Sequence, residues 1–348
     1  MLSPTAKSLV TAPQVSEKQS AALRSGDSNL YRRILSRIEA GEPYYATVSD
    51  ELRRSGYPLR PPLNFRPPTL VYLPSALPAD GIRVGVLRSL ALTTGIFLML
   101  AIRPHCAGPV PMAAGGILIA TGLVPATVGV AVLWHEVWAS MAIALSLALY
   151  RRDRWLLSAG IGLVAVLLRK LALLYLVVMA ALAFRDGQQK ELFGWLGILA
   201  FGVAMLLAHL SFANGYVLPT DPVSPSWVRG GGWPFVLLTA QWNQAICPDW
   251  LVAITVPLAL LGLGNWRSQT GTRIAATVGG YVAAFLAIGR GDNTYWGLIY
   301  TPLLPIGLLF AGRALMDLWR AARLGPSRGS GSPAVVAANR AASSDRSG

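Results

Sequence analysis

Three acidic side chains in polar stretches of an apolar chain are candidates for a general base. Asp27 opens the stretch GDSNLY, Asp50 lies in VSDELRRSG, and Glu136 lies in LWHEVW at the start of a long apolar run. A carboxylate can take the proton of an attacking hydroxyl, and partial burial of a carboxylate raises its pKa toward the useful range. These three positions are therefore candidates for the catalytic carboxylate.

Each assignment has a simpler alternative. Asp27 could cap a helix that begins at DSNLY, because Asp is a preferred N-terminal cap. Asp50 precedes Arg53 and Arg54 at helical spacing, so solvated ion pairs would explain it as well. Glu136 could simply reach a membrane interface, although ionisable groups at the end of a membrane helix are functional candidates by default.

His135 adjoins Glu136 and is a candidate for binding a substrate. The flanking Trp134 and Trp138 are also typical of an aromatic belt at a membrane surface, which would explain the stretch without chemistry. No further histidine follows at zinc-ligand spacing. The sequence therefore predicts no metal site here, and the requirement for a divalent cation stays open.

Three cations stand where a phosphate could bind. Arg169 and Lys170 lie together between two short apolar runs, and Arg290 opens the turn RGDNTY. An arginine offers a fork of donors and a lysine a point charge, and both suit phosphate oxygens. The alternatives are that the first pair only snorkels to water, and that ordinary turn chemistry explains the residues after Arg290.

Polar and aromatic side chains could hold the rest of a substrate. We assign this role to Tyr44 and Tyr45 in GEPYY, to Asn293 in RGDNTY and to Trp233 in PSWVRGGGWPF. The glycine-rich stretch around Trp233 lacks the GxxxxGK[ST] frame of a nucleotide-binding loop. A loop lying in the membrane interface is its simpler interpretation.

A proline-rich stretch could contribute to the same site. GYPLRPPLNFRPPTL cannot form a regular helix, and it carries Tyr57, Arg60, Phe65 and Arg66. These side chains could line a sugar or phosphate site. The alternative is that the stretch only packs over the neighbouring helices.

The composition predicts what must position these residues. The chain has 348 residues, of which 53% are hydrophobic and only 13% are charged. Soluble proteins carry about a quarter charged residues, so we expect a polytopic membrane protein. The net charge of +14 is spread over short loops and the two ends. That distribution is typical of membrane topology and of contact with anionic lipids, and it argues against nucleic acid.

Apolar runs predict an all-α transmembrane bundle of about nine spans, since about 20 helical residues cross the hydrocarbon core. Those flanking Arg169 and Lys170 are short, so they could form a broken or re-entrant pair. The runs are 86–102, 109–124, 132–150, 155–168, 171–184, 192–213, 250–263, 274–288 and 296–311.

The positive-inside rule orients the bundle, because short cytoplasmic loops carry an excess of Lys and Arg. It places nearly all the candidate site residues on the external face. The predicted domains are a flexible segment 1–26, an external amphipathic segment 27–82, the bundle 83–312 and a disordered cytoplasmic tail 313–348. Cys106 and Cys247 fall on opposite faces, so we expect no disulfide.

The beginning of the chain does not fit this topology without a further assumption. Residues 1–26 hold no apolar run, yet the scheme puts them outside. We expect either that a native first helix is missing from this chain or that the N-terminus is translocated without one.

The order of these motifs resembles the type C superfamily of integral-membrane glycosyltransferases. The resemblance rests on GD, GEPYY and YPLRPPLNFRPPTL, on LWHEVWASMAIALSLALYRRDRW, on LLRKLALLYL, on WVRGGGWPF and on GRGDNTYWGLIYTPLLPIGLLF, and it covers about residues 26–312. Asp27 stands where the superfamily carries its acidic motif. Ser28 and Asn29 stand where many members carry a second acidic residue, and Lys170 departs from the acidic residue that often follows Arg169.

The resemblance implies a bacterial inner-membrane enzyme with its active site facing the periplasm. Such an enzyme moves a sugar from a polyprenyl-phosphate donor to a lipid, glycan or protein acceptor. The alternatives are a secondary transporter and a non-catalytic membrane subunit. We expect residues 26–45 to form an external amphipathic helix along the membrane surface, with Ile34, Leu35 and Ile38 facing the membrane interface and Asp27 beside the site.

Overall fold

The computed structural model describes residues 17–77 and 79–324. Within these ranges the chain is helical, with no β-strand and only an isolated parallel bridge between Arg60 and Val223. The predicted all-α class is therefore confirmed for the described part of the chain. Residues 1–16 of the predicted flexible segment and residues 325–348 of the predicted tail lie outside the described residues.

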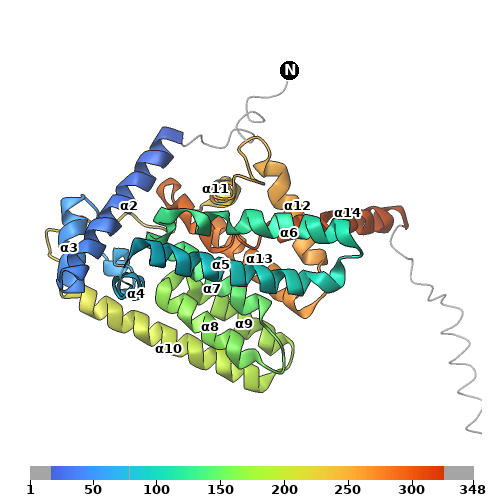
Figure 1. The fold of residues 1–348 in the computed structure, drawn as a ribbon, viewed down its shortest axis with the longest axis horizontal. Helices are drawn as coiled ribbons and strands as arrows, with labels where there is room; N and C mark the ends of the chain where they lie inside the picture. The colour runs from blue at the N-terminus through green and yellow to red at the C-terminus, as the bar shows by residue number, and fades with distance from the viewer. Residues whose placement is uncertain (1–16, 78, 325–348) are drawn as a thin grey trace, which may run out of the picture.

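An N-terminal layer, residues 17–77, covers one end of the molecule (Figure 1). Gly41 has a φ of 90°, which ends the first helix and leads into Pro43 at the start of the second. The prolines around η1 (Pro62–Asn64) allow only a short turn there. The layer consists of α2 (Glu17–Glu39), α3 (Tyr44–Arg54), η1 (Pro62–Asn64) and α4 (Thr69–Ser75).

The apolar face of α2 packs against protein, which corrects the expected membrane-surface helix. Ile34, Leu35 and Ile38 are all buried, and α2 lies against α3 and α4. On the polar face, Arg37 forms ion pairs with Glu42, Asp50 and Glu51 of the next turn and helix. An amphipathic helix needs an apolar partner, and here the following helices supply it instead of lipid.

The remaining elements form the bundle. Helix α7 lies inside it, packed against α5, α8 and α13, and nearly all of its residues are buried. The bundle helices are α5 (Asp80–Ile102), α6 (Pro109–Leu123), α7 (His135–Ala148), α8 (Trp155–Leu168), α9 (Leu173–Arg185), α10 (Gln189–Asn214), α11 (Gly232–Ala240), α12 (Val252–Asn265), α13 (Gln269–Ala287) and α14 (Ile306–Leu324). The turns between them include η4 (Gly129–Leu133), η5 (Lys170–Ala172) and η6 (Gly291–Ile299).

Among the residues that the structure describes, three helical segments are long and apolar enough to cross a membrane. They are Asp80–His105, Pro109–Thr127 and Gln189–Asn214, and Trp155–Leu168 and Val252–Asn265 are shorter apolar helices. Large apolar side chains on these helices face outward: Leu92, Ile117 and Phe193 are each about two-thirds exposed. Such a surface is unfavourable in water and indicates a membrane protein.

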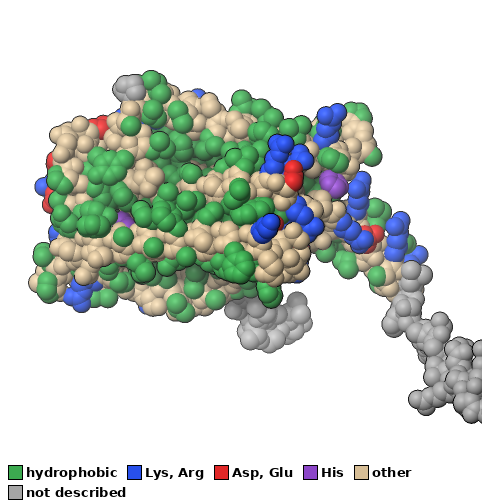
Figure 2. All heavy atoms as spheres, turned by 90° about the horizontal axis from the view of Figure 1, so that it is seen from below, with side chains coloured by type: hydrophobic (Ala, Val, Ile, Leu, Met, Phe, Trp, Pro, Cys, Tyr) green, Lys and Arg blue, Asp and Glu red, His purple; other side chains and the backbone are tan. Residues whose placement is uncertain are grey.

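The charged side chains are distributed as a membrane protein requires. Figure 2 shows hydrophobic side chains over the middle of the molecule, while Lys and Arg side chains gather at the end from which α14 projects. The N-terminal layer lies at the opposite end (Figure 1). On the face drawn in Figure 2, a largely apolar surface thus lies between the basic end and the N-terminal layer.

The chain breaks at the pair of cations, as the two short apolar runs predicted. α8 ends at Leu168, Arg169 is extended with a φ of −150° and a ψ of 119°, and η5 leads into α9. The two helices make little contact with each other, and α10 packs against both. Arg169 and Lys170 are therefore presented by a turn between helices.

The last predicted span differs from the structure. The run 296–311 is not one helix, because η6 ends at Ile299 and α14 begins only at Ile306. α14 then continues to Leu324, so residues 313–324 of the segment predicted to be disordered are helical.

Candidate functional site

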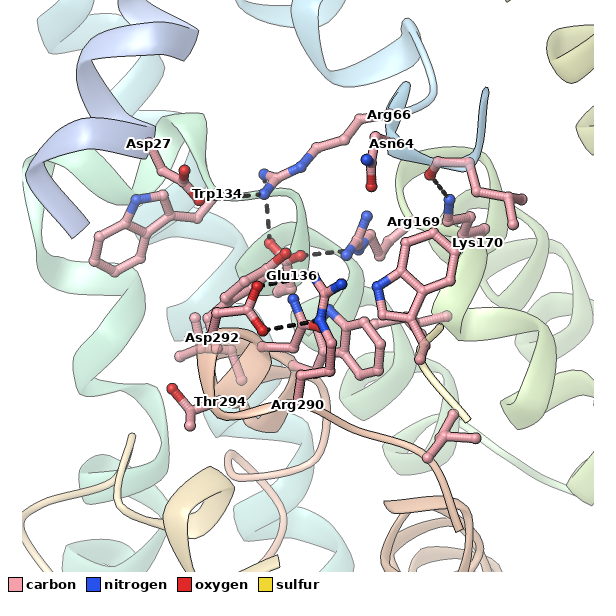
Figure 3. Close-up of a pocket in the computed structure, with 18 of the residues that line it drawn as sticks. Asp27, Asn64, Arg66, Trp134, Glu136, Arg169, Lys170, Arg290, Asp292 and Thr294 are labelled. Atoms are coloured by element: carbon pink, nitrogen blue, oxygen red, sulfur yellow. Dashed lines mark hydrogen bonds and ion pairs between the residues drawn. The ribbon is translucent and has the colours of Figure 1, made fainter. Parts of the chain in front are cut away.

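A cavity of about 560 Å³ lies between the N-terminal layer and the adjoining end of the bundle. Its walls come from α2 and the proline-rich segment, from the start of α7, from η5 and from η6 (Figure 3). Four cations and three carboxylates line it, together with several aromatic rings. The charged residues are Asp27, Arg66, Glu136, Arg169, Lys170, Arg290 and Asp292.

Glu136 is the central carboxylate of this cluster. It lies in the first turn of α7 and is only 1% exposed. Its Oε1 is 2.8 Å from Nε of Arg169 and its Oε2 is 3.8 Å from Nη1 of Arg66. The first contact is an ion pair without an aligned hydrogen bond. Two arginines thus compensate one buried negative charge, as a buried charge requires.

Arg66 reaches from the proline-rich segment toward Glu136 (Figure 3). Its guanidinium carbon lies 4.2 Å from the ring centre of Tyr31, and its Nη2 is 3.9 Å from Oδ2 of Asp27. The hydroxyl of Tyr44 donates to the backbone carbonyl of Arg66 at 2.6 Å. Arg66 therefore lies between the two carboxylates and is held by its backbone and by a ring.

Asp27 is the more accessible of these two carboxylates, with 29% of its side chain exposed. α2 begins at Glu17, so Asp27 lies inside the helix and does not cap it, which rules out the alternative drawn from the sequence. The hydroxyl of Tyr57 donates a short hydrogen bond to Oδ1 of Asp27. Burial, and then this bond to the carboxylate, raise the pKa of Tyr57, which keeps it a donor.

Lys170 faces the cavity from η5. Its ammonium donates to the backbone carbonyl of Leu63 in the proline-rich segment. Burial, and then the charges of Arg169 and Arg66, lower the pKa of Lys170 to about 7. Its charge in the substrate-free protein therefore depends on pH near neutrality.

The turn η6 forms another wall. Arg290 donates to both oxygens of Asp292 at 3.0 and 2.8 Å and to the carbonyl of Pro225 at 3.0 Å. Asn293 is buried, and its φ and ψ of −105° and 18° interrupt the helical path. Because of this kink, most of η6 can face the cavity, where an α-helix would offer only one side.

Six of the predicted site residues share the cavity although they come from four separate parts of the chain. They are Asp27, Glu136, Arg169, Lys170, Arg290 and Asn293. Their shared location is what the predicted topology required of them. Their chemical roles stay predictions.

The other predicted residues lie outside the cavity lining. Asp50 pairs with Arg54, as its alternative interpretation held, and also with Arg37 of α2. Arg53, the other arginine of that interpretation, pairs with Asp221 instead. His135 is buried behind Glu136, and its Nδ1 lies 3.4 Å from Nη1 of Arg66. Trp233 is more than one-third exposed on α11.

Both predicted tyrosines contact residues that support the cavity. Tyr44 is buried against Arg66, as described above. The hydroxyl of Tyr45 lies 3.0 Å from Nδ1 of His209 on α10, so it joins the N-terminal layer to the bundle. Neither tyrosine lines the cavity itself.

Several cavity residues are not distinguished by any sequence pattern. Arg66 was one of four side chains noted in the proline-rich segment, and nothing distinguished it from Arg60. Tyr31, Trp134 and Trp242 also line the cavity. The signal available for Arg66 was its place directly before two prolines, which fix the direction of its backbone.

The fold and the cavity define an all-helical membrane protein with a charged cavity at one end. Within residues 17–77 and 79–324, no group of three or more His, Cys, Asp or Glu side chains is placed to hold a metal ion. Comparison with known proteins adds no relative, because no family model, no curated protein and no solved structure matches the chain.

Proposed function

We propose that the chain is an integral-membrane glycosyltransferase that moves a sugar from a polyprenyl-phosphate donor to a hydroxyl acceptor. The observation that carries the proposal is the cavity itself. It combines an accessible carboxylate, Asp27, with four cations and with the rings of Trp134, Trp227 and Trp242. These are the groups needed for a base, a phosphate site and a sugar site.

An apolar pocket next to the cavity suits the hydrocarbon part of such a donor. It has a volume of about 180 Å³ and shares Lys170, Leu173 and Leu206 with the charged cavity. Met205 and Phe212, which also line it, are about half and two-thirds exposed on the outer face of α10. A chain that enters from the membrane would thus bring its phosphate to Lys170.

The proposed reaction assigns one step to each group. The carboxylate of Asp27 takes the proton of the acceptor hydroxyl as its oxygen bonds to the anomeric carbon of the sugar. The bond from that carbon to the phosphate oxygen breaks, and polyprenyl phosphate leaves with the electron pair. The cavity cations stabilise the charge that develops on the leaving phosphate. Glu136 is a poorer base, because Arg169 already holds its charge.

The same proposal includes about nine spans, a cell-membrane location and an external cavity. The cations at the end opposite the N-terminal layer support this orientation (Figure 2), since positive loops remain inside.

The test is release of polyprenyl phosphate by the full chain in membranes, from a panel of polyprenyl-phosphate sugars. We expect Asp27→Asn to reduce turnover by at least about a hundredfold, as for loss of a general base. Asp249→Asn is the matched control, because Asp249 is exposed and lies outside the cavity. Asp50→Asn tests the other carboxylate of the N-terminal layer.

Full turnover by Asp27→Asn would remove Asp27 from its role. No turnover by the wild type with any donor would favour a transporter or a non-catalytic subunit.

A further inference from the structure

The four cavity cations differ in how close their existing polar partners in the protein lie. Arg169 is 2.8 Å from Glu136, Arg290 is 2.8 Å from Asp292, and Lys170 donates to Leu63. Each of these three has a partner at close range. An incoming anion would have to displace that partner.

Arg66 has only distant partners for its guanidinium. Its nearest polar side-chain atoms are Nδ1 of His135 at 3.4 Å, Oε2 of Glu136 at 3.8 Å and Oδ2 of Asp27 at 3.9 Å. Charge-assisted hydrogen bonds of arginine are usually about 2.7–2.9 Å long. Arg66 is only 8% exposed, and its side chain lines the cavity.

The reason for these long contacts is that both carboxylates are held by other groups. Arg169 draws Glu136 toward η5, and Tyr57 bonds Asp27 from the other side. The guanidinium of Arg66 lies over the ring of Tyr31, with its carbon 4.2 Å from the ring centre. A planar guanidinium that faces a cavity and has hydrogen-bond donors without close partners is suited to binding a phosphate group.

Charge in the surroundings permits a phosphate there. Lys170 has only a neutral carbonyl as its hydrogen-bond partner, so a protonated Lys170 leaves the cluster with an excess of positive charge. That excess positive charge would attract and stabilise a phosphate bound at Arg66. The repulsion from Asp27 and Glu136 is offset because Arg169 and Tyr57 keep those carboxylates bonded.

We propose that Arg66 is the side chain that binds the phosphate of an isoprenoid phosphate ligand, and that Arg169 and Tyr57 hold the two carboxylates beside it. This inference rests on the proposed function for the identity of the ligand. The phosphate-binding group then belongs to the N-terminal layer and not to the bundle. The bound ligand would join the two.

The test measures binding of farnesyl phosphate, a short isoprenoid phosphate, to the purified full chain in lipid nanodiscs. We expect Arg66→Gln to weaken binding by about tenfold or more, and Arg66→Lys to weaken it less, because the charge remains without the fork. Arg60→Gln is the matched control. Arg60 lies in the same segment, donates to the carbonyl of Pro219 and does not line the cavity. The affinity of Arg60→Gln for farnesyl phosphate should therefore stay within about twofold of the wild-type value.

Competition identifies the group that is recognised. Displacement of farnesyl phosphate by inorganic pyrophosphate, but not by farnesol, supports recognition of the phosphate. Displacement by farnesol alone would overturn the inference, as would wild-type affinity in Arg66→Gln. A third overturning result is a larger loss of affinity in Arg290→Gln than in Arg66→Gln.

A measurement on the wild type covers the case in which the Arg66 variants do not fold. Hydrogen exchange in residues 59–68 should slow when farnesyl phosphate binds, and farnesol should have no such effect. Protection confined to residues 289–293 would overturn the inference.

Binding lost in Arg66→Gln without turnover by the wild type would leave this inference standing and reject the glycosyltransferase. Turnover together with unchanged binding in Arg66→Gln would do the reverse.

Discussion

Nε of Arg169 lies 2.8 Å from Oε1 of Glu136, and both side chains are almost fully buried. The pair joins the break between α8 and α9 to the first turn of α7. It therefore links the break between two bundle helices to a helix in which nearly all residues are buried. The candidate site is built around this contact.

Removing Arg169 should destabilise the protein strongly. We expect Arg169→Gln to lower the free energy of unfolding by about 3–5 kcal/mol, because Glu136 would remain buried with only the distant Arg66 as a partner. Unfolding in mixed detergent micelles measures this. Arg151→Gln, which breaks an exposed pair with Asp153, should cost about 1 kcal/mol or less.

The double variant Arg169→Gln with Glu136→Gln tests whether the loss of stability comes from the uncompensated charge of Glu136. It should recover part of the loss, because no uncompensated charge remains. Strictly additive losses would show that the two side chains are not energetically coupled.

Phosphate affinity should fall as the pH rises past neutrality. The pKa of Lys170 is lowered to about 7, so its positive charge is present below that pH and is lost above it. A phosphodiester probe keeps its charge across this range, which isolates the protein's contribution. We expect weaker binding at about pH 8.5 than at about pH 6 in the wild type.

Lys170→Met is the variant that assigns this pH dependence. Its affinity should be low and nearly constant over the same range. If the decline persists in Lys170→Met, another group is responsible for it.

The packing of α2 predicts the effect of a core truncation. Ile34 is completely buried against protein, so Ile34→Ala should lower the free energy of unfolding by about 2–5 kcal/mol. Thermal or detergent unfolding measures the change. A side chain that faced lipid would instead alter membrane association and leave stability nearly unchanged.

Arg32 supplies the control on the opposite face of α2. Its side chain is exposed and bonds only to Asn29 of the same helix. Arg32→Ala should change the free energy of unfolding by about 0.5 kcal/mol or less. Equal effects of the two variants would contradict the observed packing.

The orientation of the bundle can be tested by labelling in intact cells. Starting from a chain without Cys106 and Cys247, a cysteine at exposed Ser226 should react with an impermeant thiol reagent from outside. A cysteine at exposed Arg152 should react only after the membrane is opened. Reaction of both positions from the same side would reject the proposed topology.

Sequence patterns identified the cavity residues in part because they are exceptions to their surroundings. Glu136, Arg169 and Lys170 are charged groups beside apolar helices, and such groups are expensive unless they are paired or functional. Asp27 was distinguished mainly by a resemblance. Arg66 could not be selected, because its importance comes from its distances to Asp27 and Glu136, which lie far from it in the chain.

The sequence by itself determined the helical class and the membrane character, because long apolar runs with few charges can satisfy their backbone in lipid only as helices. It also determined which ionisable residues stand next to those runs. Only the tertiary structure decided what the apolar face of α2 contacts, since lipid and protein are equally good apolar partners for Ile34 and Ile38. It likewise decided which cations are already paired, because pairing depends on distances of a few ångströms between segments that are remote in sequence.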